Sequence, residues 1–429
     1  MMKLLNSIFK YRLFTGSVLM IIGSNLINGL NYIYHFIMGR MLGPASYGEL
    51  SVLFSLMGLL GIFTLSFGLV IVKFVSGAKS DEEVKKLANW INKKIILVSL
   101  IFGVFIVLIS PFLSEFLNIG NLVLFVLIAF YAVFSYPAFF NRSILQGLLK
   151  FKEMLFSILV DNSIKLTLGI LMVYLGYSVG GALFALVVAS MIGWLSSIYF
   201  IKDYLDVKTR GNPQLKAMFV YSIPVFIQSV AVTSLYSSDL VLVKHFFSSY
   251  ESGLYAALST FGKIIFFATA PISSVMFPLI SRKHSKGEGY HKVFLYSLLL
   301  TLGLSISILA AYFVFPRLII EMLYGPKFID ASYLLFKFGL FMTIFTTASL
   351  VISYYLSLGK SRIVIFPLFA AAVQLVGIWL YHDSLDTVIN VSILVVALLL
   401  ICLFIYYGHA SKINISYSSR IQAGKYHTS

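Results

Sequence analysis

Six lysine and aspartate side chains lie inside apolar stretches of the sequence, where a charge is costly. An ionised side chain at the centre of a bilayer costs about 2.5–3.5 kcal/mol on insertion scales, so such residues face a cavity or a partner. Lysines outnumber aspartates two to one in this set, which predicts a site for an anionic ligand. The six residues are Lys73, Lys165, Lys263, Lys337, Asp161 and Asp239.

Lys165 and Lys263 are the leading candidates for binding this anion, because both are expected deep in their helices. At 1.5 Å per residue, Lys165 lies roughly 17 Å from a helix start near Met154, and Lys263 about 15 Å from the outer end of its helix. Asp161 precedes Lys165 by four residues and can pair with it along one helix face. The alternative is a neutralised lysine that serves only packing.

Three further polar residues have a functional and a structural interpretation that both stay open. Lys337 is expected nearer the outer surface, where it either contacts a ligand or snorkels. Arg40 borders the Gly43-Pro44 break and either gates an outer opening or stabilises a loop. Asn31 ends a stripe of three asparagines, which either lines a path or bonds to a neighbouring helix.

Asp239 shares one helix face with Gln228, eleven residues earlier. Its carboxylate can pair with Lys263 or Lys244, couple transport to an ion, or serve as a simple interfacial charge. The expected substrate-binding set is Lys165, Lys263, Arg40, Lys337, Asn31 and Gln228, and the ion-coupling or charge-partner set is Asp161 and Asp239.

Motifs for other chemistries are absent from the sequence. It has no G-x-x-x-x-G-K-[ST] phosphate loop, no HExxH or CxxC metal motif and no GxSxG hydrolase elbow. We therefore expect no catalytic residue, metal or cofactor, while coupling to H⁺ or Na⁺ stays open. The one cysteine, Cys402, cannot form an internal disulfide.

The elements that position these residues are membrane helices. The chain is 59% hydrophobic and 11% charged, whereas soluble domains carry about 25% charged residues. Its apolar runs are continuous over roughly 20 residues, which favours helices over a barrel. The expected spans are about 15–38, 48–75, 95–116, 121–141, 154–176, 179–200, 219–243, 253–279, 293–315, 331–357, 363–381 and 387–408.

Twelve spans divide into two halves of six. The stretch around Gly48 recurs around Gly253, 205 residues later, so the same helix–turn–helix event occurs once in each half. An even number of helices in each half gives both halves one orientation, as in parallel repeats. The expected parts are a bundle at 1–202, a cytoplasmic linker at 203–216, a second bundle at 217–408 and a basic cytoplasmic tail at 409–429.

The basic residues predict the orientation in the cell membrane. Of the 32 lysines and arginines, 24 fall on one side of this topology and four on the other. Both termini are therefore expected in the cytoplasm. The net charge of +16 is spread over all the inner loops, which predicts contact with membrane lipids and not with nucleic acid.

Four stretches together resemble the polysaccharide exporters of the Wzx type, within the superfamily that also holds the MATE drug exporters. They are GRMLGPASYGELSVLFSL at 39–56, the stretch from RSILQG to GGALFA at 142–185, DLVLVKHFFSSYESGLYAALSTFGK at 239–263, and LYGPKF at 323–328. The resemblance implies a V-shaped pair of six-helix bundles around a central cavity. It also implies that polyprenyl-pyrophosphate-linked oligosaccharides are flipped to the outer leaflet by alternating access, and Lys165 and Lys263 fit a pyrophosphate.

Two other functions compete with this flippase. A cation-coupled drug exporter needs a carboxylate-rich lumen, and the excess of lysines speaks against one. A membrane-embedded glycan polymerase or ligase needs a large outer loop, while the longest one expected here, about 316–330, is short. The expected partners are an anionic lipid-linked glycan, membrane lipids and other polysaccharide assembly proteins, with the chain acting as a monomer.

Overall fold

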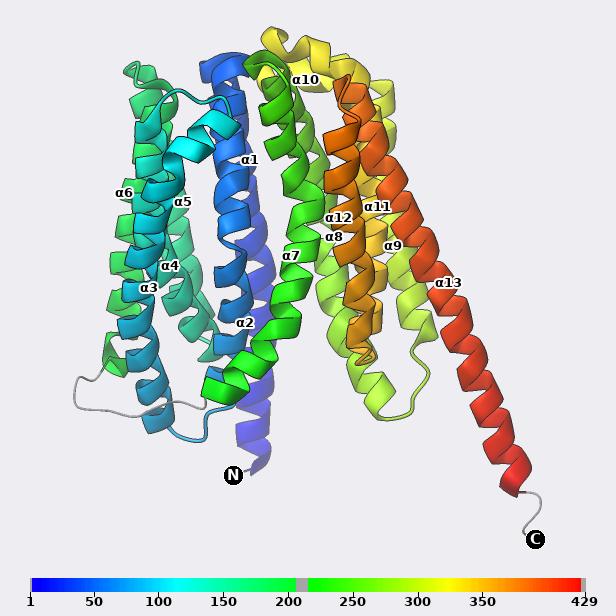
Figure 1. Cartoon of the computed structure of the whole chain (residues 1–429). Coiled ribbons are helices and arrows are strands. Elements are labelled where there is room, and N and C mark those ends of the chain that lie inside the picture. The colour runs from blue at the N-terminus through cyan, green and yellow to red at the C-terminus, as the bar shows by residue number, and fades with distance from the viewer. Residues whose placement is uncertain (1, 206–214, 426–429) are drawn as a thin grey trace. The chain divides into compact units, whose positions relative to one another are not determined.

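The computed structural model describes the backbone of residues 2–205 and 215–425, with the side chains of 19–205 and 218–406 other than 21, 219–221 and 224. This part of the chain is helical and contains no strand, so the predicted all-α fold is confirmed (Figure 1). Three short 3₁₀ helices join the longer elements. In chain order the elements are α1 (Met2–Leu60), α2 (Ile62–Ser76), α3 (Asp81–Phe116), α4 (Leu122–Gly147), α5 (Phe151–Tyr174), α6 (Ser178–Ile201), η1 (Lys202–Tyr204), α7 (Leu215–Phe246), α8 (Ser249–Ser285), α9 (His291–Val314), α10 (Pro316–Tyr324), η2 (Pro326–Ala331), α11 (Ser332–Ser357), η3 (Ser361–Val364), α12 (Ile365–Leu380) and α13 (Leu385–Lys425).

Helix α1 folds back on itself at Gly43. This glycine has φ 72° and ψ 174°, outside the helical region, and Pro44 follows it. The rings of His35 and Phe54 lie 5.3 Å apart, whereas nineteen residues of unbroken helix would separate them by about 28 Å. The predicted break is therefore a hairpin between two helical parts.

The number of spans depends on how this hairpin is treated. In the described part of the chain, ten helices are long and apolar enough to cross a membrane, or eleven if the bent pair formed by 22–60 and α2 is one span. The prediction of about twelve differs from the larger count by one. The difference lies in α1, which counts as one helix although its first part contains the predicted span 15–38 and its second part begins the predicted span 48–75, which continues through α2.

Helix α3 begins fourteen residues before the predicted span. The hydroxyl of Ser80 accepts a hydrogen bond from the backbone N–H of Glu83 at 3.3 Å, and three acidic residues occupy the first turn. Both features stabilise a helix N-terminus. Lys85 to Lys94, predicted in a loop, therefore lie on the helix.

The helices turn small polar residues inward and large apolar residues outward. On α3, Ser99 and Ser110 are buried, while the exposed fractions of Leu108 and Phe112 are 73% and 67%. Water would favour the opposite arrangement, but lipid solvates apolar side chains and small residues let helix backbones approach closely. This distribution is typical of a multi-pass membrane protein.

The described structure divides into two compact units. The first unit comprises residues 1–260 and 316–333, and the second comprises 261–315 and 334–429. In the first unit α4 packs on α2, α3 and α6, and α1 packs on α5 and α7. The predicted division into sequence halves, like the central cavity, stays a prediction, and residues 206–214 of the predicted linker lie outside the described residues.

Within the first unit, the two halves of the sequence meet at the matched glycines. A Cβ on Gly48 would lie 2.7 Å from the backbone N of Gly253 and 3.0 Å from the carbonyl O of Ser249. A Cβ on Gly253 would lie only 1.9 Å from the carbonyl O of Pro44. Pro44 and Ser249 are also 205 residues apart, so the contact is reciprocal, as expected of two repeats related by an axis.

Candidate anion-binding site

The Lys165 side chain lies between α5 and α1 of the first unit. Its Nζ donates a hydrogen bond to Oδ1 of Asn31 and lies 4.9 Å from the ring centroid of Tyr34. The Asn31 amide donates its own hydrogen bond to the carbonyl O of Ile27 at 3.1 Å, which turns Oδ1 toward the lysine. Gly169 lets the Tyr34 ring of α1 lie close to α5, the helix that carries Lys165, because a Cβ at residue 169 would lie only 3.1 Å from the ring. An amide oxygen and an aromatic face thus hold the ammonium.

Asp161 pairs with Arg142 and not with Lys165. Both Nη1 and Nη2 of Arg142 lie 3.1 Å from Asp161 Oδ2. The exposed fractions of the two side chains are 13% and 23%. The predicted span 121–141 ends just before Arg142, and this boundary is wrong because α4 continues to Gly147.

The other donors of Arg142 are fixed by Ser157 on α5. Nε donates to Ser157 Oγ at 3.1 Å, and Nη2 donates to the Ser157 carbonyl O at 3.0 Å. The Ser157 hydroxyl in turn lies 2.9 Å from Ser196 Oγ and 3.1 Å from the Gly193 carbonyl O, both on α6. Two residues of α5 therefore hold the guanidinium, and Ser157 links this cluster to α6.

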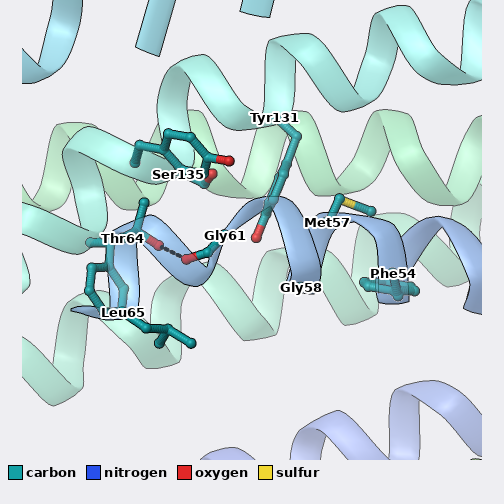
Figure 2. A pocket seen from close by; sticks show the side chains of 10 residues that line it. Phe54, Met57, Gly58, Gly61, Thr64, Leu65, Tyr131 and Ser135 are labelled. Atoms are coloured by element: carbon teal, nitrogen blue, oxygen red, sulfur yellow. Dashed lines mark hydrogen bonds between the residues drawn. The ribbon is translucent and has the colours of Figure 1, made fainter. Parts of the chain in front are cut away.

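A cavity of about 290 Å³ lies at the break between α1 and α2 (Figure 2). It is lined by, among others, Phe54, Gly58, Gly61, Tyr131, Ser135 and Tyr136. The Phe54 ring packs edge-on, at 5.9 Å, against the Tyr34 ring beside the lysine. Figure 2 shows the Tyr131 ring extending toward the Gly58–Gly61 stretch. The Phe54 and Tyr34 rings thus connect the cavity to Lys165.

Asp239 is 1% exposed on α7. Its Oδ2 accepts a hydrogen bond from the Tyr255 hydroxyl, and its Oδ1 accepts one from the Leu240 N–H, both at 2.8 Å. Lys244, predicted in an outer loop, is buried in the last turn of α7 and donates to Ser249 Oγ at 2.7 Å. It interacts electrostatically with Glu49 of α1. The Asp239 carboxylate is thus held by Tyr255 and by the adjacent backbone, and the Lys244 ammonium by Ser249.

Arg40 caps the C-terminal end of α10. Its Nε donates to the carbonyl O of Leu323 at 3.0 Å, and its Nη2 donates to the carbonyl O atoms of Glu321, at 3.3 Å, and Met322. Carbonyl groups at a helix C-terminus lack intrahelical donors, so a cation there is stabilising. The contact favours the structural interpretation of Arg40, while its predicted role in binding stays a prediction.

The remaining predicted residues are distributed over both units. Lys337, in the second unit, pairs with Asp386 at 2.6 Å, and its side chain is 43% exposed. Lys263, half-buried on α8, also belongs to the second unit. Gln228 is half-buried on α7, in the first unit. Of the predicted residues, Lys165 and Asn31 are in contact within the first unit. In the same unit Asp161 pairs with Arg142, a residue that the sequence analysis did not identify as part of the site.

Comparison with known proteins places the chain in a family. Residues 14–284 match the family model described as "Polysaccharide biosynthesis protein". The chain belongs to this family. It is also 28% identical over 288 residues to an uncharacterized membrane protein of Methanocaldococcus jannaschii, an alignment that covers 61% of this chain and 66% of that relative, just under two thirds of its length.

Members of two groups of transporters have the same fold as this family member. An inward-facing MATE family multidrug resistance transporter of the MOP superfamily matches with a TM-score of 0.75 at 14% identity, over 90% of this chain and 96% of that one. The lipid II flippase MurJ, in an inward closed conformation, matches with a TM-score of 0.74 at 15% identity, over 92% and 87%. The expected family and MATE-like fold are confirmed.

Proposed function

We propose that the protein is a transporter that moves a polyprenyl-pyrophosphate-linked oligosaccharide from the inner to the outer leaflet of the cell membrane by alternating access. Two findings support a lipid-linked substrate. The family takes part in polysaccharide biosynthesis, and the fold occurs in a lipid II flippase. In this proposal both termini are cytoplasmic, the protein acts as a monomer, and transport is coupled to H⁺ or Na⁺.

The observation that carries the proposal is the environment of Lys165. Its ammonium donates to a neutral amide, while the nearby carboxylate of Asp161 is engaged by Arg142. Two cations and one carboxylate leave an excess positive charge at membrane depth. Such a charge is costly unless an anion neutralises it. A pyrophosphate on a polyprenyl tail supplies that anion within the bilayer.

The other predicted residues have assigned roles in this proposal. Asn31 orients Lys165, and Lys263 contacts the pyrophosphate later in transport. Gln228 and Lys337 contact the glycan, and Arg40 acts at the outer end of the path. Asp239 is the candidate for ion coupling, because a buried carboxylate is a typical proton or cation site in transporters.

A glycan polymerase or ligase is less well supported than a transporter. The segment expected to supply an outer catalytic loop forms the nine-residue helix α10, and Arg40 binds the end of that helix. A drug exporter is less well supported because an excess of cationic groups repels cationic drugs.

The proposal is tested by deleting the gene and identifying the saccharide-linked polyprenyl pyrophosphate that accumulates. Re-expression of the wild-type protein should restore surface polysaccharide, whereas Lys165→Ala and Lys263→Ala should each reduce it about tenfold or more, as the loss of a charge-assisted contact at a desolvated site implies.

The control is Lys86→Ala, which removes an exposed lysine paired with Glu82 and should restore surface polysaccharide fully. Membrane levels of each variant are compared by immunoblot. Normal surface polysaccharide with both Lys165→Ala and Lys263→Ala, or no lipid-linked saccharide in the deletion strain, would contradict the proposal.

A further inference from the structure

The proposed function leaves Arg142 without a role, although its guanidinium lies between three membrane helices. Its side chain is 13% exposed, and it donates four hydrogen bonds at 3.0–3.1 Å, two to Asp161 Oδ2 and two to Ser157. Gly193 on α6 leaves the space for it, because a Cβ there would lie 2.6 Å from Nη2. A rigid guanidinium held in this way has one defined position.

The carboxylate that Arg142 holds has a second cation within reach. Asp161 precedes Lys165 by four residues on α5, and an acid placed N-terminal to a base is the more favourable order for such a pair. The two charges interact electrostatically across the helix turn. At membrane depth little water screens them, so a carboxylate without another partner would pair with the lysine.

The pair does not form in the structure. Asp161 Oδ2 points to Arg142, and the Lys165 ammonium points to Asn31 on α1 and lies against the Tyr34 ring. Neither Asn31 nor Tyr34 carries a negative charge in its ordinary state. The lysine therefore keeps its net charge, and Arg142 neutralises the carboxylate that would otherwise cancel it.

We propose that Arg142 is a positioning residue, which holds Asp161 away from Lys165 and so keeps the lysine ammonium available for an anionic lipid headgroup. This inference rests on the proposed function, because it concerns the same headgroup. The proposal predicts the net charge of the cluster formed by Arg142, Asp161 and Lys165 in the wild type and in each variant. With Arg142 the cluster has one excess positive charge, without Arg142 it has none, and without both Arg142 and Asp161 the excess returns.

The experiment measures binding of radiolabelled farnesyl pyrophosphate to the purified full-length protein in phosphatidylcholine nanodiscs, with farnesol as the competitor that lacks the charged group. Arg142→Gln should raise the Kd about tenfold or more, the size that about 1.4 kcal/mol produces. Asp161→Asn should bind at least as tightly as the wild type. The double variant Arg142→Gln/Asp161→Asn should regain wild-type affinity. If Arg142 were needed only for folding, or bound the headgroup directly, the double variant would bind as weakly as Arg142→Gln.

Two controls accompany these variants. Lys86→Gln breaks an exposed ion pair with Glu82 and should leave the Kd unchanged. Lys165→Gln should abolish the part of the farnesyl pyrophosphate binding that remains when excess farnesol is present, since that part depends on the charged group. If Arg142→Gln is not recovered from the membrane, the double variant decides, since wild-type affinity without Arg142 supports the positioning role and weak binding overturns it.

The remaining outcomes separate the two proposals. Wild-type affinity in Arg142→Gln, together with loss in Lys165→Gln, would overturn the positioning role and leave the proposed function standing. Weak binding by the double variant would mean that Arg142 contacts the headgroup itself or is needed for folding, and either result overturns the positioning role. Wild-type affinity in Lys165→Gln would overturn the proposed function and this inference with it.

Discussion

Gly193 on α6 shows how a single residue permits the charged cluster. A Cβ at this position would lie 2.6 Å from Arg142 Nη2, 3.1 Å from Asp161 Oδ2 and 3.2 Å from the Asp161 Cβ. These atoms are fixed by hydrogen bonds and by the helix backbone, so they cannot simply move aside. Glycine is therefore needed for space and not for an unusual backbone conformation.

Replacing Gly193 with Ala should lower the stability of the protein by about 1–3 kcal/mol, the usual cost of overpacking. The measurement is the thermal unfolding midpoint in detergent. The matched control is Gly303→Ala on α9, because a Cβ there meets nothing within 4 Å. Equal midpoints for the two variants would show that the cluster has room that the structure does not indicate.

The sequence allowed only part of this cluster to be predicted. Lys165 and Asp161 stand out because they interrupt apolar runs, and the cost of burying charge makes that signal reliable. Arg142 does not stand out, because the apolar run before it ends at residue 141 while the helix continues to Gly147. The contact between Lys165 and Asn31 joins residues 134 positions apart, and no local pattern specifies such a pairing.

At the scale of the helices, many boundaries followed from apolar length, and the predicted span 179–200 is α6, Ser178–Ile201. Several helices extend past their apolar runs, since α4 continues to Gly147, α8 to Ser285 and α13 to Lys425. Polar residues specify two further exceptions. Ser80 caps a helix start outside the apolar run, and the predicted outer loop after α9 forms α10, whose end Arg40 binds.

The crossing of α1 and α8 is the element-scale feature most sensitive to substitution. Gly253→Ala would place a Cβ 1.9 Å from the Pro44 carbonyl O and 2.8 Å from its Cα. Because the obstacle is backbone, the helices must separate, so we expect a loss of about 3 kcal/mol or more. Membrane levels and the unfolding midpoint measure it.

Gly29→Ala is the control for that substitution, since it lies on α1 and its Cβ meets nothing within 4 Å. It should be neutral or slightly stabilising, because alanine favours a helix over glycine by about 1 kcal/mol. A Gly253→Ala protein that is as stable as Gly29→Ala would refute the close crossing.

At the scale of the whole molecule, the arrangement of charge predicts the topology. A reporter fused after Ser429 should be cytoplasmic, because an even number of spans returns the chain to the side where it began and basic loops are retained there. A reporter inserted after Asp383, between α12 and α13, is the paired control and should be external. The opposite result for either fusion would require a different number of spans.

The reciprocal contact between Gly48 and Gly253 has a consequence for how the protein is made. Tyr47 on α1 bonds through its hydroxyl to Thr260 Oγ1 at 3.1 Å and to the Tyr324 hydroxyl at 2.8 Å. Both partners are translated after the first half of the chain has entered the membrane. A nascent chain that stops at Ile201 would lack these two partners of Tyr47 and would leave the surface of Gly48 uncovered. Each half of the sequence thus covers a glycine surface of the other, so the first half completes its packing only after the second has been synthesised.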